Sequence, residues 1–145
     1  PSHGDTVSVG TVLVKDGVTY RITADDTVEY QKADAKAKGT VVIPATVTLQ
    51  GTTYKVTSIA AKAFYNNKKL KKIVIGKNVV QIGKKAFYKC KKLSTVKINA
   101  GNLKKVGKYA FKGTARSCKV KVAKKKYKKY KKLISRAKSG VIVTK

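Results

Sequence analysis

A short apolar motif recurs along this chain every 23 or 24 residues, and this periodicity restricts the possible folds more than any other feature. Phe64, Phe87 and Phe111 mark three copies, and an alanine precedes each of them. A unit this short leaves its apolar edge exposed, so it becomes stable only when neighbouring units stack on it. The repeat therefore predicts a solenoid whose core forms between successive units.

Each unit also contains a stretch in which apolar and polar residues alternate, as expected for a short strand with one buried face. Three such strands end at Ile75, Ile98 and Val122. An earlier strand at 41–43 precedes the next by 32 residues, and the surplus falls on 49–54, where a glycine indicates a hairpin insertion. We expect four parallel strands on one wall. The predicted core is Phe64, Phe87, Phe111, Ile73, Ile75, Val96, Ile98, Val120 and Val122.

The opposite wall is expected to consist of short helical turns at the Ala-Phe steps, with the three phenylalanines stacked inside as a ladder. Gly83 and Gly107 lie four residues before their phenylalanines and are expected at a bend of the chain. The predicted fold class is thus a leucine-rich-repeat solenoid, a β-rich α/β arrangement with strands on one face and helical turns on the other.

Both ends of a solenoid need caps, because the terminal units would otherwise expose their apolar edges. Near the N-terminus, alternation in 12–14 and 18–22 around Asp16-Gly17 predicts a β-hairpin, and 27–30 is a candidate third strand. Near the C-terminus, apolar residues with helical spacing form one stripe on a lysine-rich helix. The residues of that stripe are Tyr127, Tyr130, Leu133, Ile134 and Ala137.

These patterns divide one structural domain into three parts. Residues 1–39 form an N-terminal tail and β cap, residues 40–122 about three leucine-rich repeats, and residues 123–145 a basic capping helix with a candidate final strand at 141–143. The basic helix also has the composition of a membrane-surface or heparin-binding helix. We favour capping, because the last repeat needs its apolar stripe.

The charge of the chain is large and unevenly placed. Lys and Arg total 35 against 6 Asp and Glu, a net charge of +29, and all six acids lie within the first 34 residues. Such a field attracts polyanions. Lysine greatly outnumbers arginine. The lysine ammonium is a hydrated point charge, whereas the planar arginine guanidinium can form two parallel hydrogen bonds that recognise a base or a carboxylate specifically. The balance favours diffuse attraction, and the alternative is that lysine only fills solvent-facing positions.

Outward-facing strand positions are the candidate ligand-binding residues on the concave face. Lys97 and Lys121 occupy equivalent positions in neighbouring strands, about 4.8 Å apart. At a head-group separation of roughly 6 Å in water, such a pair repels by about 0.7 kcal/mol, which a bound polyanion would relieve. Val74 interrupts the lysine row as an apolar contact. The candidate site comprises Lys72, Val74, Thr95, Lys97, Lys119 and Lys121.

Catalytic chemistry finds little support. The single histidine is His3, in the N-terminal tail, and the repeats contain no acid. Cys90 and Cys118 are too few for a disulfide scaffold or a zinc site. A buried free thiol is favoured at Cys90. The alternative is a bridge to Cys118, which lies four residues beyond Thr114, the residue expected to stack on Cys90. That offset is roughly 13 Å in extended chain, beyond the ~7 Å limit for a bridge unless a loop folds back. We expect no enzyme activity, no metal and no cofactor.

The segment Ile82-Gly83-Lys-Lys-Ala86-Phe87-Tyr-Lys-Cys90-Lys-Lys-Leu93 resembles the BspA-like, or Treponema-type, leucine-rich repeats of bacterial surface proteins. The resemblance covers about residues 40–122. Asn67 and Thr114 stand where Cys90 does, Gly76 replaces a usual proline, and Ser117 replaces the leucine. The last repeat therefore departs most from the pattern.

The resemblance implies display outside a bacterial cell or on its surface, and a role in adhesion or in binding a host factor. With the charge, it predicts a monomeric module that binds a host or matrix protein, or an anionic glycan or wall polymer. A passive spacer is the alternative. We do not favour nucleic acid, because the three phenylalanines belong to the core and no exposed aromatic platform is evident. No apolar run is long enough to span a membrane, and Pro1–Thr6 lack the apolar region of a signal peptide.

Overall fold

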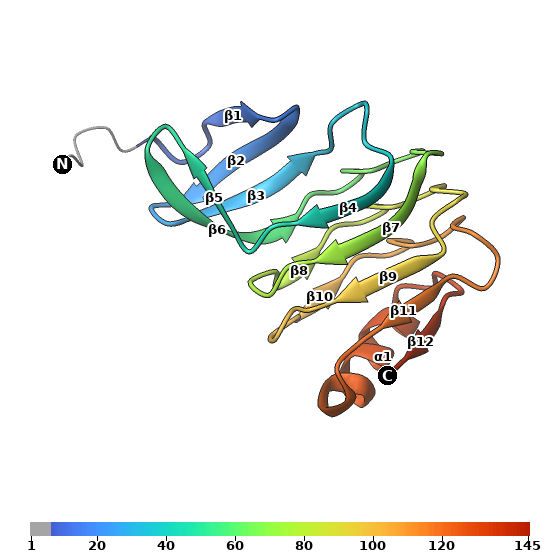
Figure 1. The fold of residues 1–145 in the computed structure, drawn as a ribbon. Coiled ribbons are helices and arrows are strands. Elements are labelled where there is room, and N and C mark those ends of the chain that lie inside the picture. The colour runs from blue at the N-terminus through green and yellow to red at the C-terminus, as the bar shows by residue number, and fades with distance from the viewer. Residues whose placement is uncertain (1–6) are drawn as a thin grey trace.

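Five parallel strands form one wall of the solenoid in the computed structural model, which describes residues 7–145 (Figure 1). This wall, sheet B, contains the four parallel strands that the repeat predicts and a fifth strand near the C-terminus. β7 and β9 bury alternate aliphatic side chains, and β11 buries Val120 between two exposed lysines, as the apolar alternation predicts. In spatial order the strands are β12 (Ile142–Thr144), β11 (Lys119–Lys121), β9 (Thr95–Ile98), β7 (Leu70–Ile75) and β4 (Gly39–Ile43).

A second sheet, sheet A, runs from the N-terminal hairpin into the repeats. β1 (Val12–Lys15), β2 (Val18–Ala24) and β3 (Thr27–Lys32) are antiparallel neighbours, and β3 pairs in parallel with β6 (Thr52–Ile59). The sheet continues into β8 (Gln81–Ile82) and β10 (Lys105–Val106), which the sequence did not predict. Each of these two strands has only two residues, too few for an alternation to show.

The inserted residues between β4 and β6 form the expected hairpin. β5 (Thr46–Leu49) pairs antiparallel with β6. The connecting residues Gln50 and Gly51 both have positive φ, 48° and 82°, as the tight turns of two-residue hairpins require. The insertion therefore adds an antiparallel arm to sheet A, and residues 40–43 of β4 still pair in register with β7.

The wall opposite sheet B, here called the turn wall, comprises residues 60–67, 83–90 and 107–114, and it is not helical. The prediction of helical turns was wrong. Backbone N–H groups bond along the stack instead: Phe64 donates to Ala86 O and Phe87 to Ala110 O, each at 2.7 Å. A helix would direct these donors to its own carbonyls four residues back. Consecutive tight turns, with positive φ at Lys62 and Asn66 in the first repeat, leave them free to join neighbouring repeats.

Gly83 and Gly107 allow the repeats to approach closely. Neither has the positive φ that would mark a conformational role. A Cβ at Gly83 would collide with the backbone nitrogen of Ala61, and one at Gly107 with that of Lys84. Their function is thus to bring stacked backbones together rather than to turn the chain.

An aromatic column fills the interior. The ring centroids of Phe64 and Phe87 lie 4.9 Å apart, those of Phe87 and Phe111 lie 5.2 Å apart, and the rings are nearly parallel. Tyr30 of β3 continues the column, 5.5 Å from Phe64, and Tyr20 meets Tyr30 edge to face. The N-terminal β strands thus close the column with the rings of Tyr20 and Tyr30. All nine residues predicted for the core are buried, which confirms that prediction.

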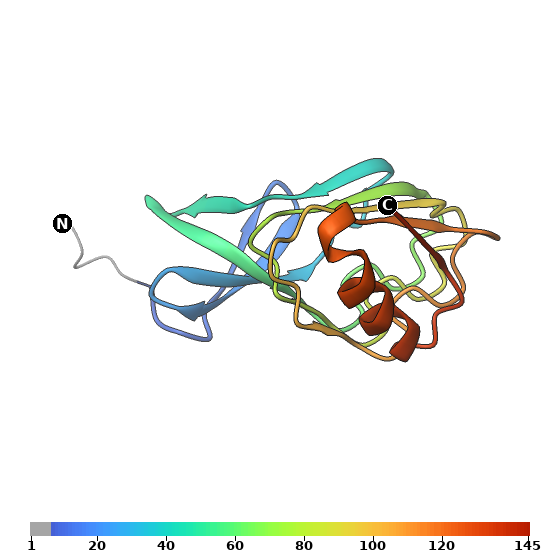
Figure 2. The same cartoon turned by 90° about the horizontal axis from the view of Figure 1, so that it is seen from below.

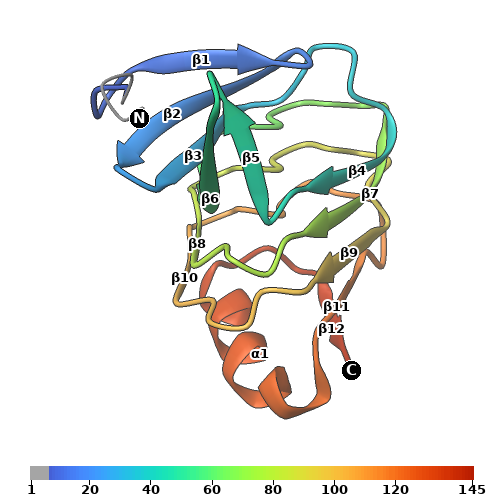
Figure 3. The same ribbon diagram turned by 60° about the vertical axis from the view of Figure 1, so that its left-hand side comes forward.

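A short helix covers the other end of the stack (Figure 2). A 3-10 turn (Lys124–Lys126) leads into α1 (Tyr127–Arg136). Tyr130 lies on the inner face of α1 and is fully buried. The hydroxyl of Tyr130 donates to Ala100 O at 2.8 Å and accepts from Leu103 N at 3.0 Å. Figure 3 shows the repeats stacked between the β1–β2 hairpin and α1. His3, the only histidine, lies outside the described residues.

Candidate functional site

The outer face of sheet B carries two rows of side chains that run across its strands. The parallel register sets Lys97 beside Lys121 and Val74 beside Lys97, as the repeat offsets predict. All six candidate residues lie on these rows. One row is Thr40, Lys72, Thr95, Lys119 and Ile142, and the other is Val42, Val74, Lys97, Lys121 and Thr144.

The second row changes character along its length. At one end Val42 is 58% exposed, beside the half-buried Val74. At the other end Lys97 and Lys121 are exposed and line a hollow of about 200 Å³ with Asn99. The sequence analysis missed Val42, although its position between two inward-facing residues of β4 is visible in the alternation. The row thus offers an apolar contact and a cationic contact side by side.

No carboxylate neutralises the lysines of this face. Within residues 7–145 the recorded ion pair is Arg21 with Glu29, at 3.5 Å in the N-terminal hairpin. The acids all precede residue 35, and those among the described residues lie in or beside β1, β2 and β3. The repeats therefore keep an uncompensated positive field, which favours anionic ligands.

The turn wall carries exposed aromatic side chains, which contradicts the expectation that none is present. Tyr65 is 44% exposed and stacks on Tyr88 with centroids 5.5 Å apart. Tyr109 is half-buried, with the ammonium groups of Lys108 and Lys112 at 4.9 and 4.4 Å from its ring centroid. These two lysines lower the pKa of the Tyr109 phenol, because they stabilise its anion. The 23-residue interval between Tyr65 and Tyr88 was a signal for this column.

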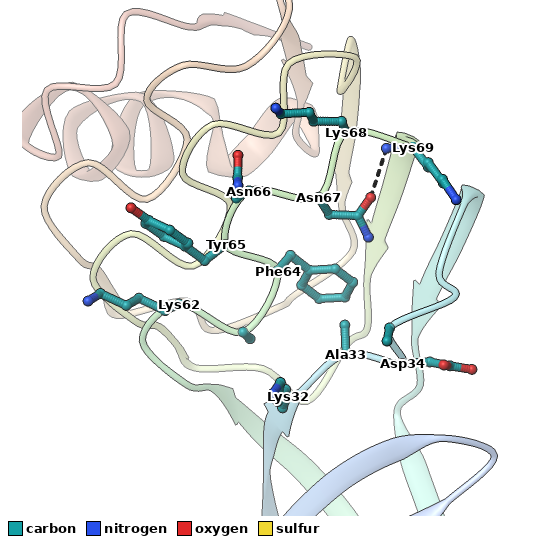
Figure 4. Close-up of a pocket in the computed structure, with 12 residues that line it drawn as sticks. Lys32, Ala33, Asp34, Lys62, Phe64, Tyr65, Asn66, Asn67, Lys68 and Lys69 are labelled. Atoms are coloured by element: carbon teal, nitrogen blue, oxygen red, sulfur yellow. Dashed lines mark hydrogen bonds between the residues drawn. The ribbon is translucent and has the colours of Figure 1, made fainter.

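A recess of about 570 Å³ lies at the N-terminal end of the turn wall (Figure 4). The close-up shows Phe64 and Tyr65 pointing to opposite sides of the first turn, with Lys62 on the side of Tyr65. Asn67, which takes the repeat position of Cys90, accepts a hydrogen bond from Lys69 N at 2.8 Å and ties the turn to β7. Residues 32–35, which follow β3, line the recess together with residues 62–69 of the first turn.

The two cysteines are free and buried, as favoured from the sequence. The thiol of Cys90 donates to Phe64 O at 3.1 Å, and burial raises its pKa to about 11. A thiol with so high a pKa is a poor nucleophile at neutral pH. Burial also raises the pKa of Cys118. Both cysteines therefore act as packing residues.

Within residues 7–145, no group of three His, Cys, Asp or Glu side chains is placed to hold a metal ion. No helix in this part of the chain has the length and apolar character needed to cross a membrane. The chemistry on offer at the surface is thus charge, aromatic contact and apolar contact.

Comparison with protein families matches residues 46–135 to a model described as the BspA type leucine rich repeat region, in six copies. No curated protein sequence matches the chain. Among solved structures, a leucine rich cell surface protein from Faecalibacterium prausnitzii aligns with TM-score 0.64 and 26% identity. That alignment covers 79% of this chain and 34% of the other, so this chain spans about a third of that relative.

Two further structures extend the likeness. A leucine-rich repeat protein from Bacteroides capillosus has 28% identity and TM-score 0.66, with 78% of this chain and 83% of the other covered. The T. pallidum leucine rich repeat protein has 24% identity and TM-score 0.59, and the alignment covers 77% of this chain and 53% of the T. pallidum chain. At that identity the likeness supports the fold alone. The family match covers more than half of the residues and agrees with the stacked repeats described above. The chain belongs to the BspA-type leucine-rich repeat family.

Proposed function

We propose that this chain is a binding module that recognises an anionic macromolecule through the outer face of sheet B. The observation that carries the proposal is the register-aligned row in which Val42 and Val74 adjoin Lys97 and Lys121. An apolar contact beside uncompensated ammonium groups suits an acidic segment of a protein that also presents an apolar side chain. Anionic glycans and wall polymers would use only the lysine half of the row.

The proposed location is outside the cell or on its surface. One similar protein is described as a leucine rich cell surface protein, and family membership makes the same setting reasonable for this chain. Both cysteines are buried and have no part in the proposed binding. A protein-binding role also needs neither metal nor cofactor. We propose no enzymatic activity.

Binding to a panel of purified extracellular-matrix proteins and anionic glycans, measured between about 50 mM and about 200 mM salt, tests this function. A specific ligand should saturate, and its affinity should fall as salt rises. A ligand that binds through the outer face of sheet B should lose affinity strongly in Lys97→Glu with Lys121→Glu. Lys128→Glu with Lys129→Glu, two exposed residues of α1, changes the net charge equally and is the matched control.

Val42→Ser separates a protein ligand from a glycan ligand. The exposed valine adds apolar contact area, so a protein partner should bind the variant more weakly and a glycan should not respond. A passive spacer predicts that nothing on the panel saturates. Equal losses in the sheet B pair and the α1 pair would refute the assignment to this face.

A further inference from the structure

We propose that the turn wall carries a second binding surface, separate from sheet B, for a linear anionic glycan. The surface, here called the tyrosine–lysine column, lies on the outside of the turns whose inner side holds the phenylalanines. It consists of Tyr65, Tyr88, Tyr109, Lys85, Lys108 and Lys112.

Aromatic rings position the ammonium groups of this column. Lys85 Nζ lies 5.1 Å from the ring centroid of Tyr88, and Lys112 Nζ lies 4.4 Å from that of Tyr109. An ammonium group over a tyrosine ring is attracted by the ring quadrupole, which restricts a side chain that otherwise moves freely. The column is therefore an ordered set of cations, whereas no aromatic contact is recorded for Lys97 or Lys121 within residues 7–145.

Order among the cations favours binding, because part of the entropy of fixing a long side chain is already lost in the free protein. The column also has no carboxylate to displace, since the repeats contain no acid. A ligand with sulfate or carboxylate groups could thus pair with these ammonium groups at a smaller ordering cost than on sheet B.

The backbone of the turns sets the positions of these side chains. Lys62, Lys85 and Tyr109 occupy equivalent repeat positions and have φ of 61°, 56° and 61°. Residues other than glycine and asparagine rarely adopt this left-handed conformation, which is disfavoured by contact of Cβ with the following carbonyl. Positive φ recurs four residues later, at Asn66, Lys89 and Gly113, so this conformation belongs to the tight turns that every repeat uses.

The ring contacts favour a glycan over single-stranded nucleic acid. The ring of Tyr88 is already covered by Tyr65 and by the ammonium groups of Lys85 and Lys89. A nucleic-acid base needs an open ring face on which to stack. The column instead offers phenol hydroxyls beside cations, a combination that hydrogen bonds with sugar hydroxyls and pairs with anionic substituents.

An acidic peptide is also less suited to this wall. Extended peptides gain affinity by adding a strand to an open sheet edge. Along the turn wall the backbone groups already bond between repeats, as Phe64 does with Ala86 and Phe87 with Ala110. A ligand can therefore contact only side chains here, which a rigid sugar chain does with less loss of conformational entropy than a flexible peptide.

Affinity for a heparin oligosaccharide of defined length, measured by calorimetry at near-physiological salt, tests the proposal. Lys85→Gln with Lys112→Gln should weaken binding by about tenfold, equal to about 1.4 kcal/mol. Lys97→Gln with Lys121→Gln removes the same charge from sheet B and should change the affinity much less. An equal or larger loss in the sheet B pair would overturn the proposal.

Tyr88→Leu with Tyr109→Leu keeps the net charge and removes the rings that order the lysines. Heparin affinity should fall by about threefold, the size of an exposed cation–π contact. Unchanged affinity would show that charge alone binds the glycan and would overturn the role of the column. Thermal unfolding of each variant verifies that the fold is retained.

Two further probes with the same number of negative charges decide the ligand class. Oligothymidylate and a polyglutamate peptide should each bind more weakly than the heparin oligosaccharide, and tighter binding by either would overturn the choice of a glycan. The outcome is independent of the proposed function, because Lys97 and Lys121 are unchanged in both column variants. Loss of a protein ligand in the sheet B variant would in turn leave the column result unaffected.

Discussion

Phe64 and Tyr65 are neighbours in the chain, yet their side chains join two aromatic columns with different surroundings. The inner column, Phe64, Phe87 and Phe111, is buried, and its rings stack at 4.9 and 5.2 Å. The outer pair, Tyr65 and Tyr88, stacks at 5.5 Å with lysines over its rings. The stacking geometry is nearly the same on both sides. Burial is what separates them, so we expect the inner column to govern stability and the outer column to govern contacts.

The largest expected effect lies in the inner column. Phe87→Ala should destabilise the fold by about 3–5 kcal/mol, because it removes a fully buried ring and leaves a cavity between two others. Denaturant unfolding of the variant measures this loss. A change below about 1 kcal/mol would mean that the column is not the main core contact and would break the comparison.

The spacing of both columns depends on the approach of the repeats. Gly107→Ala should cost about 1–3 kcal/mol, since the added methyl meets the backbone of Lys84 and forces neighbouring repeats apart. Gly101→Ala is the control, because a Cβ at Gly101 has no atom within 4 Å and its φ is not positive. Equal stability of the two variants in thermal unfolding would show that the repeats are not in close contact at this glycine.

Titration of the tyrosines distinguishes the buried from the exposed rings. Burial raises the pKa of Tyr20 to about 12 and also raises that of Tyr30, whereas Lys108 and Lys112 lower that of Tyr109. Because the folded chain holds the proton of Tyr20 more tightly than the unfolded chain does, its contribution to stability is complete below pH 10 and is lost as the pH rises through 12.

The near-ultraviolet absorbance of phenolate gives the measurement. Tyr109→Phe should remove the earliest part of the titration curve, and Tyr20→Phe should remove a late part that coincides with unfolding. A single transition shared by all tyrosines in the folded protein would contradict the difference between inner and outer rings.

The smallest expected effect lies in the outer column. Tyr88→Ala should change the free energy of unfolding by about 1 kcal/mol, well below the loss at Phe87, because Tyr88 is only half-buried. Its comparison with Phe87→Ala, one residue away in the chain, sharpens the contrast between the columns. A loss close to that of Phe87→Ala would assign the tyrosines to the core rather than to binding.

Sheet B could be predicted from the sequence, because each strand spans enough residues for its alternation and repeat offset to be visible. β8 and β10 could not, since each contributes one buried side chain from two residues. The turn wall was assigned the wrong secondary structure. An Ala-Phe step in a repeat indicates an inward-facing ring but does not distinguish a helical turn from paired tight turns, which differ in where the backbone donors point.

The candidate surface on sheet B follows from register, so the positions of Lys97 and Lys121 could be predicted. The outward position of the tyrosines could not be predicted, because the repeat offset aligns Tyr65 with Tyr88 but does not show on which side of the turn their rings lie. At the third repeat the 24-residue offset places Tyr109 in the repeat position of Lys85, and Lys112 in that of Tyr88. The two residue types therefore exchange positions in this repeat.

That exchange has a consequence for a polymeric ligand. A perfectly repetitive surface offers a polymer several equivalent alignments, each shifted by one unit, so the ligand can slide without losing contacts. In the third repeat, Tyr109 stands where the second repeat has Lys85, and Lys112 stands where it has Tyr88. The surface of the third repeat therefore differs from that of the first two, which gives the row of repeats a direction. One alignment then differs in energy from the others, and reversing the order through Tyr109→Lys with Lys112→Tyr would turn a fixed position into a sliding one.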